Sequence, residues 1–179
     1  MKTTSVSYDS STLIPEFSLP STRGGVYLGP KDFRQQSNMV IFFFHDWPCD
    51  HCRHLLRTLK EHADLFDWLD TRVLAIARSP LSALAPEAAE LGPEITLLAD
   101  QDGSVAQTYM GASGDISLPF LVIADRYGAF FSRMELEPGE EIDFGELEST
   151  LLFIATQCPE CGRPTDEPPA GMGAGGKRG

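Results

Sequence analysis

Two hydrophobic patterns meet in the first third of the chain. Residues 38–44 form a short apolar run rich in strand-favouring side chains, which is typical of a buried strand. From residue 52 onward, apolar residues recur at helical spacing with charged residues between them, which predicts an amphipathic helix that ends near residue 69. The junction at residues 47–52 reads Trp-Pro-Cys-Asp-His-Cys. We therefore expect the candidate active site at this strand-to-helix junction.

The rest of the chain repeats the same two patterns. Further strands are predicted at 72–77, 95–99, 118–124 and 129–136, and further helices at 80–91, 104–110 and 142–156. Before the first long strand, residues 17–28 predict a short hairpin around a Gly-Gly turn, and residues 30–33 a helical turn. Because parallel neighbouring strands need crossover connections, this order predicts an α/β fold with a central mixed sheet flanked by helices.

Composition divides the chain of 179 residues into three parts. Residues 1–13 are polar and are expected to form a flexible N-terminal arm. Residues 14–156 hold all the predicted elements and are expected to form one domain. Residues 157–179 begin with Gln-Cys-Pro-Glu-Cys-Gly and continue as a tail rich in Pro and Gly, which we expect to be disordered.

Charge and cysteine usage narrow the function classes. The net charge of −12 argues against a nucleic-acid partner, because phosphate binding needs clustered Lys and Arg. The chain has no long apolar run that would span a membrane and no apolar segment of a secretory signal, so we expect a cytoplasmic protein. All four cysteines lie in CxxC pairs, which indicates redox or metal chemistry rather than structural disulfides.

The first pair, Cys49 and Cys52, has the spacing and setting of a redox-active dithiol. One helical turn brings two such sulfur atoms close enough to form a disulfide. The exposed N–H groups and the positive end of the helix stabilise a thiolate on the first cysteine. We therefore predict thiol–disulfide chemistry at Cys49 and Cys52.

The order of elements resembles the thioredoxin fold, since a strand, a CxxC helix, a later Leu-Pro before a strand, a hairpin and a closing helix follow one another. The N-terminal hairpin and the segment Leu-Leu-Ala-Asp-Gln-Asp-Gly at 97–103 resemble the redoxin branch. This branch holds the AhpC/TSA family and related thiol-disulfide oxidoreductases. The resemblance covers roughly residues 15–156 and implies a thioredoxin-like fold with an N-terminal β-hairpin extension, and chemistry that requires no cofactor.

The resemblance also implies roles for individual residues. Cys49 would be the attacking thiolate and Cys52 the resolving thiol. Pro119 would be the cis-proline that packs beside the disulfide. Trp47 resembles the tryptophan near the thioredoxin motif, although here Pro48 stands between it and the first cysteine.

The residues around the motif bear on proton transfer and redox potential. Thioredoxin buries an aspartate on the strand before its motif, and here that role is vacant or falls to His45 or Asp46. His51 resembles the histidine of oxidising relatives and, as an imidazolium, would favour the Cys49 thiolate. Asp50 acts in the opposite direction because it places negative charge beside that thiolate. We expect a potential more oxidising than that of thioredoxin.

A peroxiredoxin-like peroxidase is the second candidate function. That family places Thr or Ser three residues before its cysteine, Pro seven residues before it, and an arginine near the peroxide. For Cys49 these places hold Asp46 and Phe42, and Arg126 and Arg133 lie beyond the late proline. The thiol-disulfide prediction therefore ranks first. A thioredoxin-fold adaptor that binds zinc or senses redox state is the third alternative.

The second pair, Cys158 and Cys161, resembles a zinc knuckle, but it could equally be a relay dithiol that exchanges electrons with the first pair. A zinc site built from the first pair together with His51 and His54 is the non-redox alternative. Expected partners are protein or small-molecule thiols and disulfides, peroxides in the peroxidase alternative, and a thioredoxin- or glutathione-type electron donor. No nucleic-acid or membrane partner is expected, and the sequence does not decide between a monomer and a homodimer.

Overall fold

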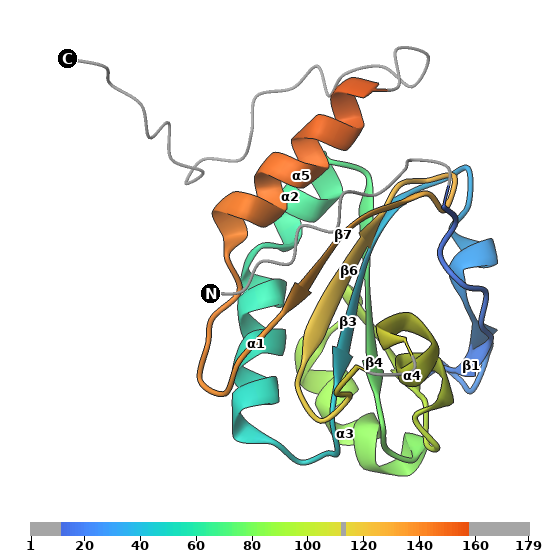
Figure 1. The fold of residues 1–179 in the computed structure, drawn as a ribbon. Helices are drawn as coiled ribbons and strands as arrows, with labels where there is room; N and C mark the ends of the chain where they lie inside the picture. The colour runs from blue at the N-terminus through green and yellow to red at the C-terminus, as the bar shows by residue number, and fades with distance from the viewer. Residues whose placement is uncertain (1–11, 112–113, 158–179) are drawn as a thin grey trace.

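A five-stranded mixed sheet forms the centre of the protein in the computed structural model, which describes residues 12–111 and 114–157 (Figure 1). Its order is β5-β4-β3-β6-β7. Strands β3, β4 and β5 are parallel, whereas β6 and β7 run antiparallel to their neighbours, which confirms the predicted mixed sheet. The strands are β3 (Asn38–Phe44), β4 (Thr71–Ala77), β5 (Ile95–Ala99), β6 (Phe120–Ala124) and β7 (Phe130–Glu135).

Helices cover both faces of this sheet, as Figure 1 shows for α1 and α5 on one side and α4 on the other. The apolar residues of α1, α2, α3 and α5 pack into one core cluster. Those of α4 join the N-terminal segment in a second cluster on the opposite face. The helices are α1 (Asp50–Glu61), α2 (Ala63–Trp68), α3 (Leu81–Leu91), α4 (Ser104–Met110) and α5 (Phe144–Gln157).

Strand β3 is buried along its whole length, because both faces of the sheet are covered at its position. Its side chains alternate between the two cores: Phe42 and Phe44 face the α1 side, whereas Ile41 and Phe43 face the α4 side. The ring of Phe43 stacks on Phe120 of β6, with 4.5 Å between ring centres. The CxxC motif follows the carboxyl end of this buried central strand, and the packing of β3 therefore fixes where the motif begins.

The N-terminal hairpin is present as predicted. Strands β1 (Leu19–Pro20) and β2 (Tyr27–Leu28) pair antiparallel, and a 3-10 turn, η1 (Pro30–Asp32), follows them. Apolar side chains of this extension pack against the α4-side core. The extension therefore closes the sheet face that the short helix α4 leaves open.

The start of the described chain is more ordered than the sequence indicates. We expected residues 1–13 to form an arm, but the Phe130 N–H donates to the Thr12 carbonyl at 2.9 Å, and Leu13 forms an antiparallel bridge with Ala129. Backbone pairing to the start of β7 compensates for the polar sequence of this segment. Thr12 and Leu13 thus pair with the sheet, although the predicted boundary of the domain lies at residue 14.

The helix after the CxxC motif ends earlier than predicted. A single helix was expected to run to about residue 69, but His62 has φ −100° and ψ 18° and separates α1 from α2. The His62 Nδ1–H donates to the Thr58 carbonyl at 2.8 Å, and its ring stacks on Phe144 with 3.6 Å between ring centres. These contacts stabilise the interruption between α1 and α2. The apolar spacing continues through His62, so the sequence pattern did not predict that the helix is interrupted there.

Two further predictions concern membrane spans and the C-terminal segment. No helix among residues 12–111 and 114–157 is both long enough and apolar enough to cross a membrane. Cys158, Cys161 and the C-terminal tail lie outside the described residues. The zinc, relay and disorder predictions for that segment therefore stay predictions.

The packing beneath α1 gives a test of the fold. Leu56 is fully buried in the α1-side core, so Leu56→Ala should lower the free energy of unfolding by about 2–5 kcal/mol. The next residue, Arg57, is exposed and pairs with exposed Glu90 at 3.2 Å, so Arg57→Ala should cost about 0–1 kcal/mol. Urea unfolding curves of both variants check this, and equal losses would contradict the packing described for α1.

Candidate active site

Cys49 begins helix α1 as its N-cap residue. Its backbone is extended, with φ −141° and ψ 120°, and its carbonyl accepts the first helical hydrogen bond from the Arg53 N–H at 2.9 Å. The Cys52 N–H donates to the Cys49 Sγ at 3.2 Å. A sulfur atom in this position lies among unpaired N–H groups and at the positive end of the helix, and both stabilise a thiolate. Cys49 is half-buried, so its sulfur remains within reach of a substrate.

Cys52 lies one turn further into the helix and is completely buried. Burial raises the pKa of the Cys52 thiol well above its ordinary value, and the hydrogen bond with Cys49 adds to this shift. Cys52 is therefore a protonated thiol at neutral pH. Cys49 is partly exposed at the start of the helix, whereas Cys52 is enclosed and protonated. This difference is what the predicted roles of nucleophile and resolving thiol require.

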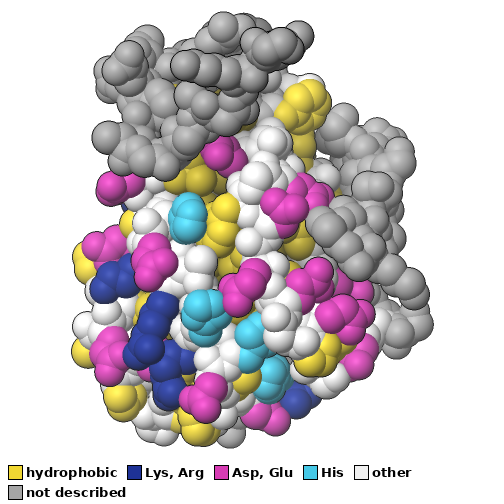
Figure 2. Space-filling view, turned by 90° about the vertical axis from the view of Figure 1, so that its left-hand side faces the viewer, with side chains coloured by type: hydrophobic (Ala, Val, Ile, Leu, Met, Phe, Trp, Pro, Cys, Tyr) yellow, Lys and Arg dark blue, Asp and Glu magenta, His cyan; other side chains and the backbone are white. Residues whose placement is uncertain are grey.

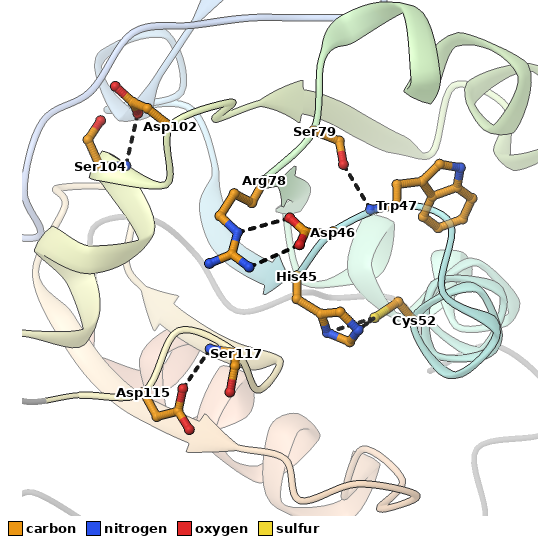
Figure 3. Close-up of polar contacts among 10 residues, drawn as sticks. All are labelled: His45, Asp46, Trp47, Cys52, Arg78, Ser79, Asp102, Ser104, Asp115 and Ser117. Atoms are coloured by element: carbon orange, nitrogen blue, oxygen red, sulfur yellow. Dashed lines mark hydrogen bonds and ion pairs between the residues drawn. The ribbon is translucent and has the colours of Figure 1, made fainter.

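His45 is the basic side chain in contact with Cys52. Its Nδ1 lies 3.5 Å from the Cys52 Sγ and its Nε2 lies 3.9 Å from it, and Figure 3 shows the ring directed at the sulfur. The sequence left proton transfer open between His45 and Asp46. Asp46 instead binds Arg78 through two hydrogen bonds of 3.0 and 3.1 Å, and the Arg78 guanidinium lowers the pKa of the Asp46 carboxyl.

The loop between β3 and α1 is held by residues that follow β4 (Figure 3). Arg78 holds Asp46, and the Trp47 N–H donates to the Ser79 Oγ at 2.8 Å. The Trp47 ring packs edge-on against Phe44 at 5.8 Å between ring centres. Sequence reasoning did not single out Arg78 or Ser79. The available signal was topological, since parallel strands β3 and β4 end at the same edge of the sheet.

The proline assignments need one correction. The resemblance implied a cis peptide bond before Pro119, but the cis bond of the described residues joins Trp47 to Pro48. Both isomers of an X–Pro bond lie within about 1 kcal/mol in an unstructured chain, so spacing alone does not select the proline. Pro119 still lies at the expected edge of the sheet, because Phe43 of β3 is paired with Phe120 of β6.

His51 and His54 do not join the sulfur atoms. The His51 ring donates through Nε2 to the Glu140 carbonyl at 2.9 Å, and His54 Nε2 lies 3.0 Å from the Glu141 carboxylate. Both rings thus contact the segment between β7 and α5, and Figure 2 shows a face of the molecule on which histidines lie among acidic and basic side chains. The predicted alternative of a zinc site with His51 and His54 is therefore wrong for this arrangement.

The acidic residue inside the motif has its own partner. The Asp50 carboxylate is fully exposed and lies 3.0 Å from Arg53, which also lies 3.4 Å from the buried Glu87 carboxylate. The Arg53 guanidinium sits 5.0 Å above the centre of the Trp47 ring. Arg53 thus offsets part of the negative charge that Asp50 brings near Cys49. The expected oxidising potential stays a prediction.

A family model for the AhpC/TSA family matches residues 11–136, which is more than half of the chain. The chain belongs to the AhpC/TSA family. The match includes the N-terminal hairpin, the CxxC helix and all five strands of the central sheet, ending one residue beyond β7. A comparison with curated proteins finds no match.

Solved structures with the same fold include peroxiredoxins and thiol–disulfide proteins. Peroxidoxin BcpB from Mycobacterium tuberculosis has a TM-score of 0.68 at 18% identity, covering 78% of this chain and 94% of that one. The mitochondrial 2-Cys peroxiredoxin of Plasmodium falciparum has a TM-score of 0.67 at 17% identity, covering 85% of this chain and 97% of that one. A Chlorobium tepidum protein described as a thiol:disulfide interchange protein, DsbE, has a TM-score of 0.64 at 20% identity, covering 82% of this chain and 97% of that one. These likenesses establish the thioredoxin-like fold.

The arginines considered for a peroxidase pocket lie away from the motif of this AhpC/TSA protein. The Arg126 N–H donates to the Asn38 side chain at the start of β3, which is the end opposite the CxxC motif. Arg133 contacts the Tyr109 and Met110 carbonyls at the end of α4, on the face opposite α1. Neither residue is therefore placed to bind a peroxide at Cys49.

The unequal surroundings of the two thiols give a direct test. Iodoacetamide at a near-neutral pH of about 7 to 8 should alkylate Cys49 about tenfold or more faster than Cys52, because Cys49 is partly exposed whereas Cys52 is buried and its pKa is raised by that burial. Fragmentation mass spectrometry of the peptide that holds both cysteines measures the two rates. In Cys49→Ser, Cys52 should stay slow to react. Equal rates at both sites in the native protein would contradict the assignment.

Proposed function

We propose that this AhpC/TSA protein is a thiol–disulfide oxidoreductase in which Cys49 is the nucleophile and Cys52 the resolving thiol. The observation that carries the proposal is the position of Cys49 as the N-cap of α1, with its Sγ accepting the Cys52 N–H at 3.2 Å. This arrangement stabilises an accessible thiolate and keeps a second thiol one helical turn away. Family membership supports redox chemistry on thiols in general.

The first step is attack on a substrate disulfide. The Cys49 thiolate attacks one sulfur of the substrate, a mixed disulfide forms at Cys49, and the other substrate sulfur leaves as a thiolate that takes a proton from solvent. Trp47 and the loop around it are held by Ser79 and Arg78, so the attacking sulfur starts from a defined position.

The second step needs Cys52 to lose its proton. Burial keeps this thiol protonated, and His45 is the base in contact with its sulfur, at 3.5 Å from Nδ1. Transfer of the proton to His45 frees the Cys52 thiolate to attack the Cys49 sulfur of the mixed disulfide. A Cys49–Cys52 disulfide forms, and the second substrate sulfur leaves as a thiolate that takes up a proton from His45 or from solvent. An external dithiol or two molecules of a monothiol then return two electrons and two protons to the pair.

The proposal also covers the substrates, the electron donor and the cellular compartment. Substrates are protein or small-molecule disulfides, and the electron donor is of the thioredoxin or glutathione type. Two sulfur atoms carry the electrons, so the cycle requires no bound cofactor. We place the protein in the cytoplasm because its cysteines occur only in CxxC pairs, and neither nucleic acid nor membrane takes part. The cycle uses residues of a single chain.

The principal test is reduction of insulin disulfides with dithiothreitol as the electron source. Wild type should accelerate insulin reduction, and Cys49→Ser should return the rate to the uncatalysed background because the nucleophile is lost. Cys52→Ser should accumulate a mixed disulfide at Cys49, seen by non-reducing electrophoresis and mass spectrometry. His54→Gln is the matched control, because it changes an exposed histidine of the same helix and should leave the rate unchanged.

The outcomes separate the alternatives. A peroxiredoxin-like peroxidase is the second candidate, favoured by the family match. Hydrogen peroxide with NADPH, thioredoxin reductase and thioredoxin tests it, and Cys49-dependent NADPH consumption without insulin reduction would replace the first proposal by the second. No catalysis in either assay would overturn both enzyme proposals and leave the adaptor alternative.

The role of His45 has a separate test. His45→Gln should slow closure of the Cys49–Cys52 disulfide on the order of 10²-fold, because Cys52 then loses the base that contacts its sulfur. Stopped-flow mixing of the reduced protein with a chromogenic disulfide measures attack by Cys49 and release of the second thiol as separate phases. Only the second phase should slow. Equal slowing of both phases would assign His45 to positioning of the loop instead.

A further inference from the structure

The two cysteines of the dithiol and the neighbouring His45 also form a cluster of metal-ligating atoms. A ring nitrogen of His45 and the sulfur atoms of Cys49 and Cys52 all lie within 4.8 Å of one another. We propose that His45, Cys49 and Cys52 form a binding site for Zn²⁺ when the dithiol is reduced. Binding rests on this geometry alone, whereas its effect on turnover rests on the proposed function.

The distances in the cluster fit tetrahedral zinc. Zn–S bonds of about 2.3 Å and Zn–N bonds of about 2.0–2.1 Å imply S···N separations of about 3.6 Å and S···S separations of about 3.8 Å between neighbouring ligands. The His45 Nδ1 lies 3.5 Å from the Cys52 Sγ, which matches the first value. The remaining separations do not exceed 4.8 Å, so small side-chain rotations suffice to close the site.

The donor set selects the kind of ion. Two thiolates and an imidazole are ligands that zinc and soft ions prefer, whereas Mg²⁺ and Ca²⁺ require oxygen ligands. The nearby carboxylate of Asp46 is bound to Arg78, and His51 is bound to the Glu140 carbonyl. Three protein ligands thus leave a fourth position for water or an external thiolate, on the side where Cys49 is accessible.

Metal binding and disulfide formation exclude one another, because both use the two sulfur atoms. Binding displaces the protons of the thiols. When a substrate disulfide oxidises the pair, the two thiolates lose two electrons and become the Cys49–Cys52 disulfide. The substrate takes up these two electrons, together with two protons from solvent, and leaves as two thiols. Zn²⁺ is then released because both of its sulfur ligands are lost.

The test uses full-length protein with Cys158→Ser and Cys161→Ser, so that the second CxxC pair does not bind the probe. The reduced protein, titrated with zinc chloride against a chromophoric chelator, should bind one Zn²⁺ per chain. Co²⁺ in place of zinc should give a near-ultraviolet sulfur-to-metal absorption. His45→Gln should weaken zinc binding at least tenfold and change the cobalt spectrum, whereas His54→Gln should do neither. The disulfide form should bind no zinc.

Two results would overturn the site: no zinc bound by the reduced protein, or equal zinc affinity in His45→Gln and its parent. Cys49→Ser is the second variant and should also lose tight binding, and normal circular dichroism spectra must accompany both losses. Insulin reduction in the presence of EDTA is measured in parallel. Activity without zinc binding would reject only the metal site, and zinc binding without activity would reject only the proposed oxidoreductase. Added zinc should inhibit the parent protein, and EDTA should restore its rate.

Discussion

The hydrogen bond from the Cys52 N–H to the Cys49 sulfur is the contact on which the site depends. It fixes where helix α1 begins, and it places one sulfur at the helix end and the other inside the core. Every other feature of the site follows from this division. Cys49 can meet a substrate because it caps the helix, and Cys52 needs a neighbouring base because it is enclosed. His45 meets that need from the end of β3.

Much of the fold could be predicted because burial on both faces gives a strand a continuous apolar run. The predicted bounds of 38–44 and 104–110 coincide with β3 and α4. Predictions failed where a single contact outside the pattern decides the backbone. His62 separates α1 from α2 although the apolar spacing continues past it, because its ring stacks on Phe144 from a distant helix. Contacts of this kind leave no periodic signal in the sequence.

The proximity of the two sulfur atoms of the candidate site was predictable, whereas the contacts of the surrounding residues were not. The spacing of Cys49 and Cys52 was enough to place them one helical turn apart, since the geometry of one turn is local. The contacts of the histidines are not local: His51 is closer in sequence to both sulfur atoms, yet its ring contacts Glu140, while His45 contacts Cys52. The direction of a side chain depends on the neighbouring strand or loop, and here the β7–α5 segment and the end of β4 decide it.

The net charge of −12 acts on substrates before they reach Cys49. The face that carries the histidines presents acidic and basic side chains together, as Figure 2 shows. The exposed Asp50 carboxylate is paired with Arg53, and Glu141 is paired with His54. Local charges near the motif therefore offset one another in part, and the long-range field of the whole protein is what steers diffusing molecules. This field favours cationic polypeptide segments over anionic small disulfides at low salt. Added salt weakens the difference, since the Debye length is about 8 Å at physiological ionic strength.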